Sequence, residues 1–248
     1  MAQLRSVFGF VFGLWALTAS ILSGLVVGTL GVLPFVVVPR GRRERYTMVA
    51  GQLWASVVVW AVLFTRVRVT GHWSLPRGQG AVIFCNHRSW LDPVLLMATT
   101  RSNGLSKKEI ASIPVLGPYG RLAGAVFFDR RSVEDRQRAR REVMKLVGGG
   151  HRIQVFPEGT RSLELRRKVY LTTAYDAFAH GVPVVPCAVW GTERTLPREP
   201  AAFPFRRVRL DIGEPLWPRD FDRAEAFAQA CWADVVRRVE RLRDEASA

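Results

Sequence analysis

The pattern of hydrophobic residues divides the chain into two parts. The first 65 residues contain two long uncharged stretches: no ionisable side chain occurs between Arg5 and Arg40, and a second stretch covers residues 46–65. The first stretch exceeds the roughly 20 residues that one helix needs to cross a bilayer. Its second half contains residues that favour a kink or a re-entrant bend, namely Gly24, Gly28, Gly31 and Pro34. We therefore predict that residues 1–65 form an apolar helical hairpin that anchors the chain in a membrane.

Basic residues between the two stretches indicate how the hairpin is oriented. A single acidic residue, Glu44, stands among Arg40, Arg42, Arg43 and Arg45. Positive segments prefer the cytoplasmic side, and residues 66–248, with 31 Lys and Arg against 20 Asp and Glu, should remain there too. A hairpin that dips into the cytoplasmic leaflet satisfies both preferences. A single crossing with one in-plane segment and a cleaved signal peptide are the alternatives.

Short apolar stretches of strand length alternate with helical stretches in residues 66–248. The expected strands are 66–70, 80–85, 124–128, 152–156, 184–190 and 207–212. The expected helices are one from about Pro93, then 133–147, 171–180 and 221–242. This alternation predicts an α/β domain with a mixed, mostly parallel sheet flanked by helices.

Composition narrows the class of protein without choosing a function. The net charge of +15 and the pI near 11.1 suit nucleic acid, an anionic membrane surface or a phosphate-bearing substrate. The three cysteines form no C-x-x-C pair, so neither a disulfide framework nor a thiolate metal site is indicated. The four histidines lack close metal-ligand spacing, which argues against a zinc hydrolase.

Candidate chemistry begins at residues 86–92, directly after an expected strand. His87 and Asp92 lie five positions apart, which is about 140° out of phase on a helix. They can pair only if His87 lies in the turn and Asp92 starts the helix, with Pro93 at the first helical position. The carboxylate would then orient the imidazole as a general base. The alternative is that Asp92 only caps the helix.

A second candidate segment follows the strand expected at 152–156. Residues 156–162 combine a carboxylate, a glycine, hydroxyl groups and a guanidinium in one short turn. Such a turn can bind an anion through its N–H groups and Arg161. Arg130, which follows another expected strand, is a second candidate for a phosphate contact, although each arginine could equally form a surface ion pair, for example Arg130 with Glu158.

The order of these segments resembles that of the glycerolipid acyltransferases, most closely the lysophosphatidic acid acyltransferases. The four family motifs, N-H-x-S-x-x-D, G-x-x-F-x-x-R, F-P-E-G-T-R-S and V-P-x-x-P, match residues 86–92, 124–130, 156–162 and 182–186. The resemblance implies that His87 is the general base and Asp92 its orienter. It also implies a glycerol-phosphate site formed by Arg130, Glu158, Gly159, Thr160, Arg161 and Lys107.

The resemblance implies an O-acyltransferase without a metal or cofactor. An acyl group would pass from an acyl-CoA or acyl carrier protein thioester to the hydroxyl of a lysophospholipid, most simply lysophosphatidic acid, at the cytoplasmic face of the membrane. The chain departs from many relatives at residues 169–172, where they have a Phe-Lys-Lys-Gly-like segment. An acceptor with another head group, including an amino-lipid, is therefore an alternative.

Two other classes of mechanism are open at this stage. Cys85 and His87 would share one face if the strand continued, which would suit a covalent acyl-cysteine enzyme. A non-catalytic basic protein that binds membranes or nucleic acid would explain the charge alone, but it would not need His87 and Asp92. We expect no nucleic-acid partner. We expect residues 66–248 to be the catalytic domain.

Overall fold

A single mixed sheet organises the part of the chain that the computed structural model describes, which is residues 2–32, 40–72, 74–112, 117, 120, 125–129, 131–166 and 168–247. The strands are β1 (Arg66–Thr70), β2 (Ala81–Cys85), β3 (Asn103–Lys107), β4 (Val126–Phe128), β5 (Arg152–Val155), β6 (Val184–Trp190) and β7 (Arg207–Ile212). Their order is β1-β7-β6-β2-β5-β3-β4. Of the described strand pairs, β6 and β7 are antiparallel and the others parallel. The predicted mixed, mostly parallel sheet is confirmed.

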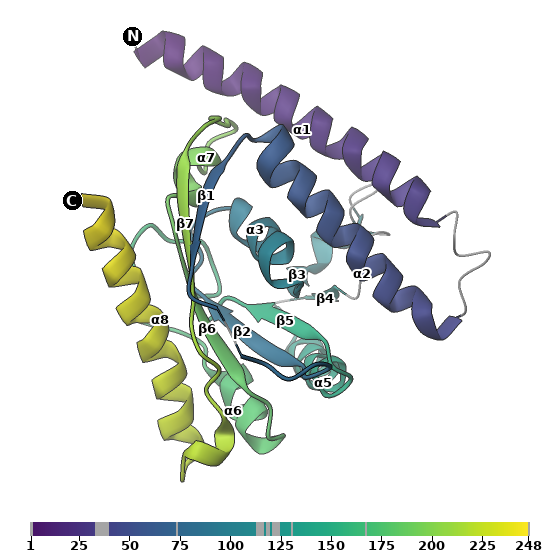
Figure 1. Cartoon of the computed structure of the whole chain (residues 1–248), viewed down its shortest axis with the longest axis vertical. Coiled ribbons are helices and arrows are strands. Elements are labelled where there is room, and N and C mark those ends of the chain that lie inside the picture. The colour runs from purple at the N-terminus through teal and green to yellow at the C-terminus, as the bar shows by residue number, and fades with distance from the viewer. Residues whose placement is uncertain are drawn as a thin grey trace.

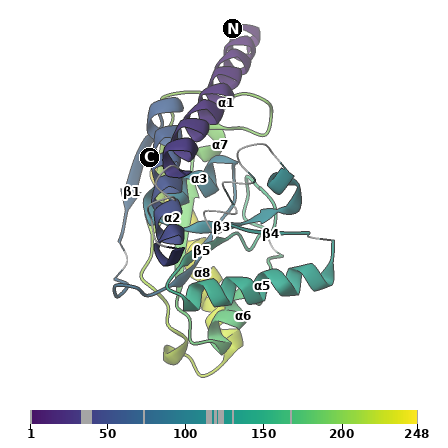
Figure 2. The ribbon, with the colours of Figure 1, turned by 90° about the vertical axis from the view of Figure 1, so that its right-hand side faces the viewer.

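Helices cover both faces of the sheet (Figures 1 and 2). They are α1 (Ala2–Val32), α2 (Arg40–Ser56), α3 (Leu91–Thr100), α5 (Val133–Gly148), α6 (Thr172–Ala179), α7 (Thr192–Thr195) and α8 (Ala224–Ser247), with a π-helix at Val57–Val62 and short 3-10 helices at Lys108–Ser112 and Pro218–Asp220. Strand β2 shows how the faces divide, because successive side chains alternate between them. Val82 and Phe84 pack with α5, α6 and α8, whereas Ile83 and Cys85 pack with α3 and the π-helix.

The two N-terminal helices lie side by side against the second of these faces (Figure 1). The indole N–H of Trp54 in α2 donates to the carbonyl of Ser20 in α1 at 3.0 Å. Among the described helices, α1 alone is long and apolar enough to cross a membrane, over Gln3–Leu30, and 6% of its most apolar window is buried. Helix α1 is therefore a candidate membrane anchor. The boundary at residue 65 stays a prediction.

One expectation for this region needs correction, and one helix boundary was not predicted. Helix α1 runs without interruption through Gly24 and Gly28, because each glycine weakens the helix by only about 1 kcal/mol and keeps its backbone N–H. The expected kink is therefore absent up to Val32, and Pro34 lies outside the described residues. The basic connection is also partly helical, since α2 already begins at Arg40.

The element boundaries agree closely with the sequence pattern elsewhere. Strands β1, β6 and β7 have the predicted bounds, and α3 begins two residues before Pro93. Helix α8 covers Ala224–Ser247 rather than 221–242. Strand β3 was not predicted, because its residues Asn-Gly-Leu-Ser-Lys lack an apolar run. It pairs with β4 and β5 at the far side of the sheet.

Candidate active site

The turn after β2 brings His87 and Asp92 together. His87 Nδ1 lies 2.8 Å from Asp92 Oδ2. The same carboxylate oxygen accepts the backbone N–H groups of Arg88 at 2.6 Å and Ser89 at 2.7 Å. Asp92 is completely buried, and Oδ2 receives all three of these bonds, whereas Oδ1 has no hydrogen-bond partner among the described residues. The three donors hold Asp92 against the histidine ring.

This arrangement decides between the two interpretations of Asp92. The N-cap of α3 is Trp90, and it makes no side-chain capping hydrogen bond. Asp92 lies inside the first turn and bonds backward to the preceding turn instead. The interpretation of Asp92 as only a helix cap is therefore wrong, and so is the placement of Pro93 at the first helical position, which Leu91 occupies.

Asn86 and Ser89 explain why the turn adopts this shape. Asn86 exchanges two side-chain hydrogen bonds with the backbone of Val189 on β6, at 3.0 and 2.8 Å, which extends the sheet beyond the end of β2. Ser89 accepts the N–H of Leu91 and donates to the carbonyl of Leu196 at 2.7 Å. Both side chains position His87 through the backbone.

The imidazole of His87 is held on a second side by Phe156. The two ring centroids are 4.2 Å apart and the planes are inclined by 24°. The His87 side chain is 15% exposed. Because Asp92 engages Nδ1, Nε2 is the nitrogen through which the ring can exchange a proton with another molecule.

Residues 156–162 form a second turn that is bonded directly to the first. Glu158 Oε1 accepts the backbone N–H of His87 at 3.0 Å, and the N–H of Ser162 donates to the His87 carbonyl at 2.7 Å. Glu158 is buried, and its Oε2 has no hydrogen-bond partner among the described residues. Burial raises the pKa of Glu158 to about 7, the His87 N–H lowers it, and the charge of Asp92 raises it further.

Gly159 gives this turn its shape. Its φ of +67° lies in the left-handed region, and its N–H donates to the carbonyl of Phe156 at 3.0 Å. A Cβ here would lie 3.1 Å from the ring of Tyr170, as well as straining the backbone. Thr160, next in the chain, is exposed.

Arg161 lies against the first turn. Its guanidinium stands 4.7 Å above the ring of Trp90, and one terminal nitrogen is buried without a hydrogen-bond partner among the described residues. An unpaired buried guanidinium nitrogen is costly and can bind an oxyanion. Arg130 lies outside the described residues. Lys107 ends β3, and its side chain is outside the described part.

Arg88, for which the sequence suggested no role, links the first turn to α7 and to the segment after the second turn. Its guanidinium binds both carboxylate oxygens of Glu193, at 2.9 and 3.2 Å, and donates to the carbonyl of Leu163 at 2.6 Å. The guanidinium also lies 4.1 Å above the ring of Trp190. Its partners are far away in the sequence, so only its place inside the motif could have indicated a role.

Cys85 does not fit the covalent alternative. It is the last residue of β2, and its side chain is completely buried with α3 and the π-helix. Burial raises the pKa of the Cys85 thiol well above its ordinary value, with further contributions from the charges of Cys187, Asp92 and Glu158. A nucleophilic thiolate is therefore disfavoured.

Comparison with known proteins identifies the family of the chain. The model of the Acyltransferase family matches residues 66–190, half of the chain. The chloroplastic 1-acyl-sn-glycerol-3-phosphate acyltransferase BAT2 of Brassica napus is 31% identical over 167 residues, which are 66% of this chain and 48% of that protein. A lyso-ornithine lipid O-acyltransferase of Rhodobacter capsulatus is 32% identical over 126 residues, 50% of this chain and 44% of that protein. The chain thus spans about half the length of these relatives.

The fold also has a close counterpart among solved structures. The crystal structure of the 1-acyl-sn-glycerophosphate (LPA) acyltransferase PlsC from Thermotoga maritima superposes with a TM-score of 0.81 at 27% identity, covering 96% of this chain and 98% of that one. His87, Asp92, Glu158 and Arg161 all lie within the segment that the family model matches. With its family match, its sheet order and its paired histidine and aspartate, the chain belongs to the acyltransferase family.

Proposed function

We propose that the chain transfers a fatty acyl group from a thioester to the free hydroxyl of a lysophospholipid, most simply 1-acylglycerol-3-phosphate, giving phosphatidic acid. The observation that carries the proposal is the bond between His87 and the buried Asp92, which leaves Nε2 as the proton acceptor. The donor is acyl-CoA or an acyl carrier protein. The family match supports the reaction class, and the names of the relatives support a lysophospholipid acceptor.

In this mechanism His87 removes the proton of the acceptor hydroxyl as its oxygen attacks the thioester carbonyl. The carbon–oxygen ester bond forms, the carbon–sulfur bond breaks, and the proton passes to the leaving thiolate. Asp92 is a positioning residue that holds the imidazole and stabilises its protonated form. The imidazole of His87 and the two backbone N–H groups of Arg88 and Ser89 keep the Asp92 carboxylate in place during the reaction.

The acceptor's phosphate would bind beside the second turn. Arg161 offers a buried unpaired nitrogen there, and a guanidinium suits bidentate phosphate recognition. Gly159, Thr160, Glu158, Arg130 and Lys107 complete the proposed glycerol-phosphate site. A phosphate in this position would place the acceptor between Arg161 and the His87 ring.

A second candidate acceptor is a lyso-ornithine lipid. The similarity to the Rhodobacter protein supports it, and the departure at residues 169–172 is compatible with an acceptor other than the commonest one. Such an acceptor has a hydroxyl for His87 but no phosphate for Arg161. Both candidates therefore depend on His87, whereas only lysophosphatidic acid brings a phosphate to Arg161.

We further propose that the protein works at the cytoplasmic face of the membrane, with α1 and α2 anchored in that leaflet. The apolar length of α1 and the basic charge of the chain support this location. Cysteines introduced at Gly41 and Ser247 should both be unreachable by an impermeant thiol reagent from the opposite side. Labelling of the Gly41 position alone from that side would contradict the one-leaflet hairpin.

The experiment that tests the function supplies the full chain with one radiolabelled acyl group, carried either on CoA or on acyl carrier protein. The acceptors are lysophosphatidic acid, lyso-ornithine lipid and monoacylglycerol at equal surface concentration. Labelled phosphatidic acid as the main product supports the first candidate. Equal transfer to monoacylglycerol would remove the reason for a phosphate site, and no transfer from either donor would contradict the proposed activity.

A further inference from the structure

An exposed chain of aromatic rings joins α1 to the catalytic domain. Ring centroids lie 5.1 Å apart for Phe12 and Trp15, 5.9 Å for Trp15 and Phe64, and 5.4 Å for Phe64 and Phe205. Phe64 lies just after the π-helix and Phe205 just before β7. Trp15 is 44% exposed, Phe64 40% and Phe205 57%. Large aromatic side chains from three separate segments therefore meet at the surface rather than in the core.

The backbone is strained at two of these positions. Phe64 has a φ of +48° and Phe205 a φ of +58°, a region that bulky side chains rarely adopt. The N–H of Phe205 donates to the carbonyl of Phe64 at 3.2 Å, which ties the two strained turns together. Strain that holds exposed rings in place indicates a role outside the folding of the domain.

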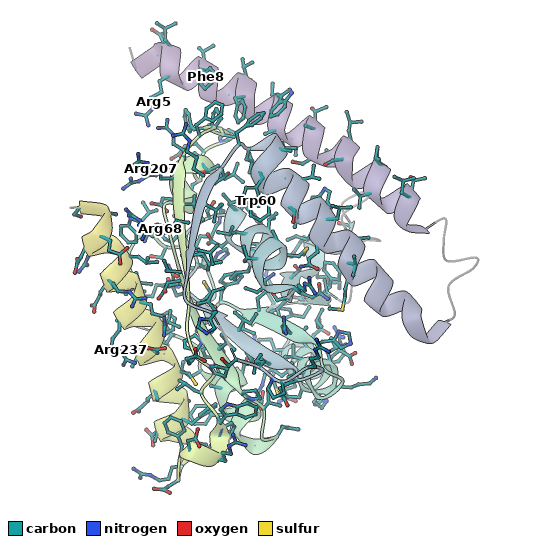
Figure 3. All side chains as sticks on the ribbon, in the orientation of Figure 1. Arg5, Phe8, Trp60, Arg68, Arg207 and Arg237 are labelled. Carbon is teal, nitrogen blue, oxygen red and sulfur yellow. The ribbon has the colours of Figure 1, made fainter. Side chains whose placement is uncertain are left out.

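Arginines surround the aromatic chain. The guanidinium of Arg66 lies 6.0 Å from the centre of the Phe205 ring, and those of Arg5 and Arg206 lie 5.5 Å from the centre of Phe203. In Figure 3, Arg5 and Phe8 stand at one end of α1, above Arg207 and Arg68 on the neighbouring sheet edge.

The sheet edge adds to this positive charge. Arg66 pairs directly with Arg207, and Arg68 with Arg209, across β1 and β7, although like charges in opposite positions repel. No carboxylate forms a salt bridge with Arg5, Arg66 or Arg207 among the described residues. By contrast, Arg238 on α8 binds both Asp211 and Asp234.

We propose that Trp15, Phe64 and Phe205, together with Arg5, Arg66 and Arg206, form an interfacial patch that docks on the head-group region of an anionic phospholipid bilayer. Aromatic rings favour the boundary between head groups and acyl chains, and arginines there attract anionic lipid. The patch is continuous with the exposed apolar surface of α1. It gives the catalytic domain a second contact with the bilayer, which fixes the rotation that α1 alone would leave free.

The test places an environment-sensitive fluorophore on the full chain in vesicles of phosphatidylcholine with phosphatidylglycerol. One probe replaces the ring itself, through Phe205→Cys. Another leaves the patch intact, through Glu199→Cys, an exposed position that lines one surface hollow together with Phe10 and Leu14 of α1. The matched control is Asp222→Cys, an exposed position just before α8 at the opposite end of the domain. The three native cysteines are buried and react slowly in the folded protein.

We expect nitroxides on the head group or shallow on the acyl chain to quench the probes at 199 and 205, whereas aqueous iodide quenches the probe at 222. Replacing both Arg66 and Arg206 with Gln should weaken docking of the patch on the bilayer about thirtyfold, as reported by the probe at position 199. The reason is that each basic residue near an anionic surface contributes on the order of 1 kcal/mol. The control pair Arg219→Gln and Arg237→Gln should leave this docking unchanged.

Iodide quenching of all three sites to the same extent would overturn the proposal, as would docking that is equal on neutral vesicles. Quenching at 199 and 205 that depends on protein concentration rather than on lipid would show a second copy as the occupant and would also overturn it. The patch rests on the membrane location proposed above. These readouts measure depth rather than turnover, so their failure would leave the proposed acyl transfer untouched.

Discussion

The two turns that form the site each bury a carboxylate beside His87, but the two carboxylates accept different numbers of hydrogen bonds. In the first turn Asp92 Oδ2 accepts three donors, from the His87 ring and two backbone N–H groups. In the second turn Glu158 receives one N–H on Oε1, and its pKa rises to about 7. Burial is the main cause of the raised Glu158 pKa, and the single N–H on Oε1 lowers that pKa only in part. The two turns therefore differ in how many donors reach the carboxylate oxygen that faces His87.

Removing the proposed base, His87, should have the largest effect. His87→Ala should reduce kcat by about 10²–10⁴-fold or more, because in the proposed mechanism His87 takes the hydroxyl proton. Initial rates at saturating substrate measure the loss, and circular dichroism checks that the fold is retained. A folded variant that still turns over at a comparable rate would show that His87 is not the base.

Removing the carboxylate of the first turn should cause the second-largest loss of kcat. Asp92→Asn keeps the size of the side chain but weakens the support of the protonated imidazole, so kcat should fall by roughly 10²-fold or more. The same change in the second turn, Glu158→Gln, should cost much less near pH 6, where Glu158 is largely protonated. Equal losses for the two variants would remove the distinction between the turns.

The acceptor contact should give an intermediate effect that is specific to one substrate. Arg161→Ala should raise KM for lysophosphatidic acid by more than tenfold, and Arg161→Lys should restore part of it, because a charged hydrogen bond contributes roughly 1.5–3 kcal/mol and lysine lacks the fork geometry. The KM for the acyl donor is the internal control. A parallel rise in both constants would indicate a structural role instead.

The pH dependence of stability tests the second turn directly. The pKa of Glu158 rises from 4.5 to about 7 on folding, so its contribution to stability is present below pH 4.5 and is lost as the pH rises to about 7. The loss should be roughly 3 kcal/mol at most. Denaturant unfolding at pH 5 and pH 8 measures it, and Glu158→Gln should flatten that part of the profile. A wild-type profile as flat as that of the variant would contradict the raised pKa.

The smallest effect on activity should come from replacing Cys85, the nucleophile of the covalent alternative. Cys85→Ser should keep kcat within a few-fold, because the buried thiol takes no part in direct attack, and should cost about 1–2 kcal/mol of stability through the buried hydroxyl. Initial rates and a denaturation curve separate the two quantities. A folded but inactive serine variant would restore the acyl-cysteine mechanism.

Local patterns predicted much of the fold and the central pair of the site. Apolar runs indicated β2, β5 and β6, and the five-residue spacing of His87 and Asp92 predicted a contact that one turn can make. Strand β3 was not predictable from hydrophobicity, since its stability comes from pairing with β4 and β5.

Long-range contacts explain the rest of what the sequence did not reveal. Arg88 meets Glu193 only because β2 and β6 are neighbours in the sheet. Likewise, the bond from the His87 N–H to Glu158 depends on β2 lying beside β5. The resemblance to known motifs predicted that these residues matter, but not that Glu158 supports the backbone of His87.

The close approach of α1 to the loop before β7 has a consequence for the order in which the protein is built. The N–H of Ala202 donates to the carbonyl of Gly9 at 2.9 Å, and a Cβ on Gly9 would lie 2.5 Å from the ring of Phe203. During translation α1 is complete long before this loop emerges from the ribosome. If α1 is already held by lipid, the growing domain must finish folding against a helix that the bilayer presents. Gly9→Leu should then leave early insertion intact and weaken the last docking step, because the Phe203 ring must move aside, and protease sensitivity of the loop would reveal the change.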